Sequence, residues 1–213
     1  MKSLCVCIYG ETCAGKSTLG KYLKSSMDCQ YISFGDSKRQ EIALGTTIGL
    51  EIQRLLKSRC PLPAELGYSV IKNVIGNYLN IVSGYPISID ELNTLANHSK
   101  IIGILLLSID EQTLIRRFSL RRECPKCQMP GVIGDSCPVH KVSMIQREDV
   151  SLKELIFRRK LYQQRIAPFL TSKVIETLPR LSLDTGVLTK EDVVCRAEKW
   201  IRETLRNQEG ESI

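Results

Sequence analysis

The sequence lacks the features that mark a membrane protein, an exported protein or a repeat protein. Its longest uninterrupted apolar run, from Ile101 to Leu107, has the length of a strand, whereas a membrane-spanning helix needs about 20 apolar residues. Glu11 and Lys16 interrupt the N-terminal segment that an export signal would keep apolar. No internal repeat and no low-complexity tract is visible. We therefore expect one continuous cytoplasmic fold with no membrane partner.

Histidine and aromatic residues are also scarce, and this narrows the chemistry. The chain has two histidines, one of which, His140, lies in a cysteine-rich segment, so a Ser/His/Asp nucleophile is not expected. The net charge excludes fewer functions. The chain has 30 Lys and Arg against 23 Asp and Glu, and the resulting net charge of +7 favours anionic partners such as nucleotides or nucleic acid. Nucleic-acid contact through the basic segment around His140 would need interleaved aromatic residues. That segment has none, so nucleic acid is not an expected partner.

The chain does contain strand-sized apolar runs that alternate with segments of helical spacing. Such alternation predicts an α/β fold with a doubly wound parallel sheet of five strands and helices on both faces. Two capping-box patterns, Ser88 to Glu91 and Ser151 to Glu154, mark helix starts. The predicted strands span residues 4–9, 30–34, 78–82, 101–107 and 181–183.

A phosphate-binding loop lies between the first predicted strand and a helix predicted over residues 16–26. It has the pattern Gly, four residues, Gly-Lys-Ser, which surrounds phosphate oxygens with backbone amides and a helix N-terminus. Lys16 would counter the β- and γ-phosphate charges, Ser17 would ligate Mg²⁺, and Thr18 would reach the α-phosphate. The predicted nucleotide-binding residues of this loop are Gly10, Glu11, Thr12, Cys13, Ala14, Gly15, Lys16, Ser17 and Thr18.

The second motif consists of two pairs of metal-ligand residues separated by nine residues. Three thiolates and one imidazole suit a tetrahedral zinc ion, and no ligand position is left open for water. We therefore expect a structural zinc that replaces the apolar core a short segment cannot build. The predicted ligands are Cys124, Cys127, Cys137 and His140. Five further cysteines are expected to serve only in packing: Cys5, Cys7, Cys29, Cys60 and Cys195.

With these two motifs in this order, the sequence resembles the adenylate kinase family of nucleoside monophosphate kinases, in the form with a zinc lid. Residues 32–39, Ile-Ser-Phe-Gly-Asp-Ser-Lys-Arg, resemble the family segment Ile-Ser-Thr-Gly-Asp-x-x-Arg. Residues 117–124 resemble the lid entry Arg-Leu-x-Gly-Arg-Arg-x-Cys. Residues 147–149 resemble the start of Arg-x-Asp-Asp, and Arg158 follows eleven residues after Arg147.

The resemblance implies a role for each matching arginine. Arg39 would hold the acceptor monophosphate and Arg117 would stack on the ATP base. Arg121, Arg147 and Arg158 would join Lys16 as the catalytic residues that stabilise the transferred phosphoryl group. For three neighbouring arginines we expect no more than a solvated surface: Arg122, Arg159 and Arg165.

The resemblance also implies the domain organisation and the reaction. Residues 1–34, 64–120 and 147–213 would form a P-loop core, 35–63 a monophosphate-binding arm, and 121–146 a zinc lid. Closure of the lid would exclude water while the γ-phosphate passes from ATP, bound with Mg²⁺, to a nucleoside monophosphate. The protein would act as a monomer.

The acceptor site departs from the family pattern. The family segment Asp-Gly-Phe-Pro-Arg is Ser83-Gly84-Tyr85-Pro86-Ile87 here, and the glutamine that reads adenine is replaced by Glu91. The Glu91 carboxylate would accept from a donor edge such as that of guanine, or would instead close the capping box with Ser88. The loss of both charges leaves a second function open, a catalytically weak nucleotide-binding protein with a regulatory or assembly role. The implied acceptor-binding residues are Asp36, Arg39, Gly84 and Glu91.

Overall fold

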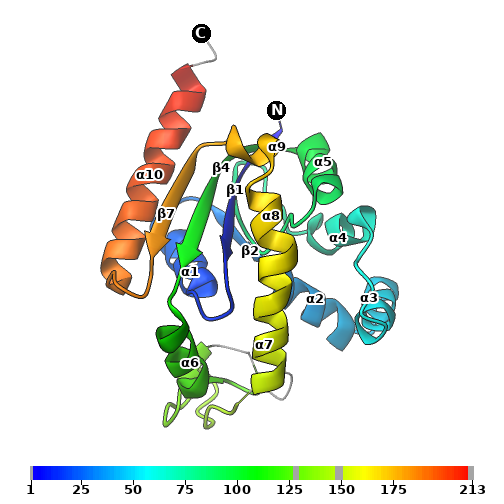
Figure 1. The fold of residues 1–213 in the computed structure, drawn as a ribbon, viewed down its shortest axis with the longest axis vertical. Coiled ribbons are helices and arrows are strands. Elements are labelled where there is room, and N and C mark those ends of the chain that lie inside the picture. Colours follow the sequence, from blue (N-terminus) through cyan, green and yellow to red (C-terminus); the bar gives the residue numbers. More distant parts are fainter. Residues whose placement is uncertain (1, 127–129, 147–150, 211–213) are drawn as a thin grey trace.

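The computed structural model describes residues 2–126, 130–146 and 151–210, and its centre is a five-stranded parallel sheet in the order β2-β3-β1-β4-β7 (Figure 1). The predicted fold class is confirmed. All five predicted strands are present with shifted ends: β1 (Ser3–Gly10), β2 (Gln30–Ser33), β3 (Leu79–Ser83), β4 (Ser99–Ser108) and β7 (Arg180–Asp184). The start of β4 extends beyond its apolar run because the Ser99 hydroxyl forms a buried hydrogen bond of 2.9 Å with the Ser3 hydroxyl.

Helices cover both faces of the sheet (Figure 1). Helices α1 and α10 pack on one face, and α2 to α5 with α8 and α9 pack on the other. No helix among the described residues is both long enough and apolar enough to cross a bilayer. The helices are α1 (Lys16–Ser26), α2 (Phe34–Ala43), α3 (Thr47–Lys57), α4 (Ala64–Ile71), α5 (Ile89–His98), α6 (Glu111–Leu120), α7 (Leu152–Leu161), the π-helical turn η1 (Tyr162–Ile166), α8 (Ala167–Leu170), α9 (Lys173–Glu176) and α10 (Lys190–Gly210).

Two apolar clusters hold these layers together, and β1 contributes to both. Side chains of a strand alternate between the two faces of its sheet, so Cys5 and Cys7 point into one cluster while Val6 and Ile8 point into the other. The expected packing role is confirmed for Cys5 and Cys7, which are buried. It is wrong for Cys60 and Cys195, which are exposed, because one lies in the turn after α3 and the other on the outer face of α10.

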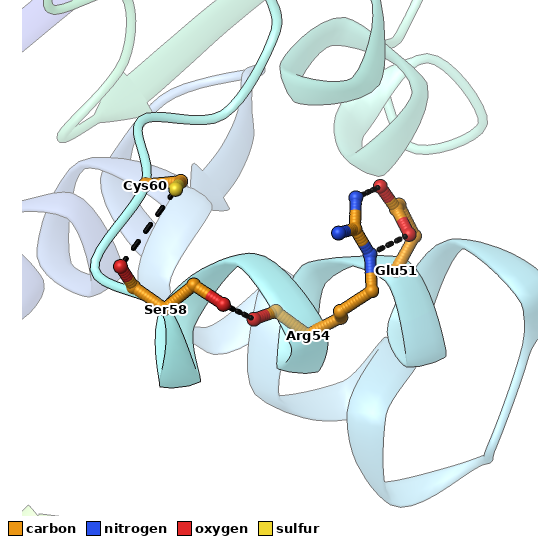
Figure 2. A network of polar contacts seen from close by, with 4 residues as sticks. All are labelled: Glu51, Arg54, Ser58 and Cys60. Carbon is orange, nitrogen blue, oxygen red and sulfur yellow. Dashed lines mark hydrogen bonds and ion pairs between the residues drawn. The ribbon is translucent and has the colours of Figure 1, made fainter.

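Residues 35–63 form a helical hairpin at the edge of the molecule. Helix α2 begins directly after β2, where the Ser33 hydroxyl accepts the Asp36 N–H at 3.3 Å, a normal N-cap contact. Figure 2 shows how α3 ends: the Arg54 guanidinium donates to both carboxylate oxygens of Glu51, at 2.8 and 2.6 Å, and its carbonyl accepts the Ser58 hydroxyl at 3.1 Å. The ion pair lies within α3, and the Ser58 contact lies at the C-terminal end of the helix, before the chain turns toward α4.

Residues 121–146 leave the sheet as a small antiparallel structure. Strand β5 (Arg121–Glu123) pairs with β6 (Pro130–Val132), and isolated bridges join Glu123 to Ile145 and Ser136 to Ser143. In the described part of this segment, the buried apolar side chains are those of Cys124 and Cys137. The described residues of the segment therefore form no apolar core of their own, as the sequence predicted.

Candidate active site

The phosphate-binding loop follows β1 at the carboxyl edge of the sheet, where the strand order reverses and ligands of α/β proteins bind. Both glycines of its pattern are required by the backbone. A Cβ at Gly10 would lie 2.5 Å from the carbonyl oxygen of Leu107 on β4. Gly15 precedes α1 in the left-handed conformation, with φ of 91°. The loop therefore wraps tightly and directs its amides toward the start of α1.

A cleft of about 460 Å³ lies over this loop and collects side chains from four parts of the chain. Glycine and small residues of the loop form its floor, α2 contributes one wall that includes Arg39, and α6, β5 and α7 contribute the other arginines. The sequence-predicted residues that line it are Thr12, Cys13, Gly15, Lys16, Ser17, Thr18, Asp36, Arg39, Gly84, Arg117, Arg121 and Arg158. Gly10, Glu11, Ala14 and Glu91 do not line it, and Arg147 lies outside the described residues.

Sequence reasoning missed several residues of the cleft. Ser33, Phe34, Lys38, Leu120 and Val132 all line it. Lys38 falls on an unspecified position of the resembling segment, and its place next to Arg39 gives no signal, because consecutive residues of a helix do not point in the same direction. Leu120 and Val132 are ordinary apolar residues whose place depends on how β5 and β6 fold over the loop, which no local pattern reveals.

Lys16 is held inside the loop before any nucleotide is bound. Its Nζ donates to the carbonyls of Gly10 at 2.6 Å and Glu11 at 2.7 Å. Burial lowers the pKa of Lys16 to about 8, and the Arg121 charge adds to this, while Cys13 and Glu11 act in the opposite direction. The ammonium therefore sits where a phosphate anion would relieve the cost of its burial.

Arg117 joins the cleft to a second, smaller cavity of about 230 Å³. Its guanidinium donates to the Thr185 carbonyl, to the Thr185 hydroxyl at 3.2 Å and to the Cys13 carbonyl at 3.4 Å. These contacts fix the plane of the guanidinium, and the apolar side chains of Leu188 and Val193 also line the cavity. A fixed guanidinium beside apolar side chains suits a flat aromatic ring.

Arg159 was expected to be a solvated surface residue, and the structure corrects this. Its Nε lies 3.2 Å from Glu11 Oε2 and its Nη1 lies 2.8 Å from Glu111 Oε1. The pair with Glu11 is largely shielded, since the two side chains are 28% and 18% exposed. Arg159 thus ties the phosphate-binding loop to α7 and to the start of α6. No motif carries this link, because the three residues are far apart in sequence.

The residues that the sequence implies for acceptor binding lie in different surroundings. Asp36 and Arg39 form a close ion pair on α2. Glu91 is buried at 4% exposure, and its Oε2 accepts the Ile87 N–H at 2.7 Å. The Ser88 hydroxyl accepts the Glu91 N–H at 3.2 Å, so one half of the predicted capping box forms while the carboxylate bonds one residue earlier than expected. Burial raises the pKa of Glu91.

Cys13 of the phosphate-binding loop adopts a left-handed conformation, with φ of 67°. A β-branched residue is strained there. We expect Cys13→Val to lower the free energy of unfolding by about 1–2 kcal/mol, and Cys13→Gly to change it by less than about 1 kcal/mol because relief of strain offsets lost packing. Urea denaturation would measure both, with Cys195→Val on exposed α10 as the control. Equal decreases in the free energy of unfolding for the two variants would contradict the inference that the backbone at Cys13 is strained for a β-branched residue.

Three of the four predicted zinc ligands converge in the small antiparallel segment. The ligand atoms of Cys124, Cys137 and His140 lie within 4.8 Å of one another. The His140 Nδ1 is 3.7 Å from Cys124 Sγ and 3.6 Å from Cys137 Sγ, close to the edge of about 3.6 Å that tetrahedral zinc bond lengths imply. The fourth, Cys127, lies outside the described residues.

The sulfurs of this cluster also have the partners that thiolate ligands need. The Lys126 N–H lies 3.4 Å from Cys124 Sγ, and the His140 N–H lies 3.4 Å from Cys137 Sγ. Amide donors of this kind stabilise and orient metal-bound thiolates. The donor set and its surroundings therefore fit zinc.

Comparisons with known proteins agree with this geometry. No protein-family model matches the chain. The chain is 30% identical over 181 residues to the adenylate kinase of Pseudothermotoga lettingae, covering 76% of this chain and 82% of the relative. It is 30% identical over 181 residues to the adenylate kinase of Pyrococcus furiosus, with coverages of 78% and 81%, and 27% identical over 184 residues to that of a Hydrogenobaculum species, with coverages of 76% and 84%. The chain belongs to the adenylate kinase family.

Proposed function

We propose that the protein transfers the γ-phosphate of ATP to a nucleoside monophosphate. The observation that carries this proposal is the single cleft in which the phosphate-binding loop faces Arg39 from α2, Arg121 from β5 and Arg158 from α7. Cationic side chains from separate elements that converge on one phosphate-binding loop can hold two phosphorylated substrates in the in-line arrangement that phosphoryl transfer needs. Family membership supports a nucleoside monophosphate kinase that uses ATP.

The roles of the residues follow from where charge moves in phosphoryl transfer. The loop amides and Lys16 would hold the β- and γ-phosphates, and the slot beside Arg117 would hold the base of ATP. Arg121 and Arg158 would donate to the equatorial oxygens of the transferred group, where charge spreads in the transition state. Arg147, outside the described residues, is proposed for the same role. Mg²⁺ held at Ser17 would neutralise charge between the β- and γ-phosphates.

We also propose that residues 35–63 and 121–146 are moving parts on the core formed by residues 1–34, 64–120 and 147–213. The cleft walls come from all three, so closure of the 35–63 arm and the 121–146 lid would bring the arginines onto both substrates. Closure would also remove the water that would otherwise accept the phosphoryl group. The zinc cluster would serve only to keep the lid folded.

The test is formation of nucleoside diphosphate from ATP, with AMP, GMP, CMP, UMP and the deoxy forms as acceptors. We expect turnover with at least one acceptor, with a rate at least about 10³-fold above that of Lys16→Met. Turnover no higher than that variant for every acceptor would overturn the proposal.

One observation favours a second candidate, a nucleotide-binding protein with little activity. Ser83 replaces the aspartate of the family pattern, and Ile87, which replaces its arginine, packs against the apolar core instead of lining the cleft. Both losses affect the acceptor half, while the loop and Arg117 are retained. If calorimetry detects ATP binding and no acceptor is turned over, this second candidate would be supported and the kinase would be contradicted.

A further inference from the structure

Lys38 lines the cleft although no motif assigns it a role. It lies on α2 next to Arg39, and its side chain is half-buried. Its Nζ lies 4.5 Å from the centroid of the Phe34 ring. Within residues 2–126, 130–146 and 151–210, Lys38 Nζ has no hydrogen-bond or ion-pair partner. A charged group in this position needs an explanation, because an ammonium loses hydration when it is buried.

The protein charges around Lys38 do not supply that explanation. Burial lowers the pKa of Lys38, and the charges of Arg39 and Arg158 lower it further, while Glu91 alone opposes them. The Glu91 carboxylate already accepts the Ile87 N–H at 2.7 Å, and the Asp36 carboxylate pairs with Arg39. Positive charge therefore exceeds negative charge on this side of the cleft, which is the condition for binding an anion.

A purely structural role would not need the charge. The Phe34 ring on which Lys38 lies packs against the Tyr85 ring in a tilted arrangement, with ring centroids 4.9 Å apart and an interplanar angle of 42°. A methionine of similar length could cover the same ring without an ammonium. The contact of the ammonium with the Phe34 ring is favourable, and an anion in the cleft could bind the ammonium without displacing that contact.

The position of Lys38 points to one of the two substrates. Arg117, beside the proposed slot for the ATP base, lies on α6, whereas Lys38 lies on α2, and Figure 1 shows these helices on different sides of β1. The other cations near Lys38 are Arg39 and Arg158. If Arg39 holds the acceptor, an anion that reaches this group would enter from the acceptor end of the cleft.

We propose that Lys38 binds the phosphate of the acceptor nucleoside monophosphate, together with Arg39. The substrate class rests on the proposed function. An ammonium on a long flexible stem is suited to phosphate as a point charge. Lys38 thereby supplies, from α2, the positive charge that the family pattern would place at position 87, where this chain has Ile87 packed against the core.

The test compares wild type, Lys38→Met, Lys38→Arg and the control Lys57→Met. Lys57 is an exposed lysine at the end of α3 in the same arm and does not line the cleft. Calorimetry would give the dissociation constants of AMP, GMP, CMP and UMP and of the four matching nucleosides. Coupled assays would give KM for each acceptor, KM for ATP, and kcat.

Loss of one phosphate contact is expected to weaken binding of all four monophosphates by about ten-fold in Lys38→Met. Binding of the nucleosides and KM for ATP should change by less than about two-fold, Lys38→Arg should restore most of the affinity, and Lys57→Met should match wild type. Unchanged monophosphate affinity in Lys38→Met would overturn the proposal, and so would an effect confined to one base or equal for the nucleosides.

The two proposals fail in different ways. Monophosphates that bind wild type and lose affinity in Lys38→Met, but are never phosphorylated, would overturn the kinase and retain the Lys38 site. Turnover with an acceptor KM that Lys38→Met does not change would retain the kinase and overturn the Lys38 site. Absence of monophosphate binding to wild type would overturn both.

Discussion

Lys16→Met is expected to lower kcat/KM for phosphoryl transfer by at least about 10³-fold while the protein stays folded. The physical reason is position: Lys16 Nζ is held by the carbonyls of Gly10 and Glu11, directly inside the loop that would receive the β- and γ-phosphates. Methionine keeps the length of the side chain and removes the charge. Coupled assays at saturating acceptor would measure the loss, with Lys24→Met on the exposed face of α1 as the matched control.

The same substitution should not destabilise the unliganded protein. Burial lowers the pKa of Lys16 to about 8, below its value of about 10.4 in an unfolded chain. Between these pH values the unfolded chain binds more protons, so the folded state gains stability as pH rises and carries a penalty below about pH 8. At pH 7 we expect the free energy of unfolding of Lys16→Met to equal that of wild type or to exceed it by up to about 3 kcal/mol. The difference should shrink toward pH 10.

Urea denaturation at pH 7 and at pH 9.5 separates the two effects. A variant that loses activity and also unfolds more readily at pH 7 would contradict this account, because the loss of rate would then follow from loss of structure. Lys24→Met should show wild-type stability at both pH values.

The structural features that the sequence predicts correctly are those that depend on residues close together in the chain. The loop of residues 10–17 and its flanking strand and helix are fixed by neighbouring residues, and helix α1 has the predicted bounds of Lys16 and Ser26. Strand ends were less accurate. The predicted strand of residues 78–82 starts one residue early, since Tyr78 is 52% exposed and β3 begins at Leu79.

Contacts that close over long separations in sequence could not be predicted. Arg159 looks like any arginine on a basic helix, and its role emerges only when α7 packs beside Glu11 and Glu111. Glu91 is the opposite case, a residue to which the sequence assigned a role that the structure does not give it in full. The pattern predicted that its carboxylate closes a capping box or contacts the acceptor base, whereas the carboxylate is buried and accepts the Ile87 N–H. Pattern identifies residue types that can do chemistry, whereas the packing of helices on the sheet decides which of them face the cleft.

Removal of the zinc ligands is expected to have the largest effect on stability. The described part of residues 121–146 buries no apolar side chains other than the thiols of Cys124 and Cys137, so bound zinc would take the place of an apolar core. We expect purified protein to hold about one zinc per chain, and Cys137→Ser to lose it. The melting temperature should fall by about 5–10 °C, which corresponds to roughly 2–4 kcal/mol for a protein of this size.

Chelated wild-type protein distinguishes loss of metal from loss of a buried thiol. If zinc carries the stability, metal-free wild type should melt close to Cys137→Ser, and readdition of zinc should restore only the wild type. Cys195→Ser, at an exposed thiol of α10, should keep both the metal and the melting temperature. Limited proteolysis should cut first within residues 121–146 of the metal-free form, because strands β5 and β6 then lose their support while the five-stranded sheet does not. Zinc-free protein that melts like the wild type and resists proteolysis there would show that the antiparallel segment folds without a metal.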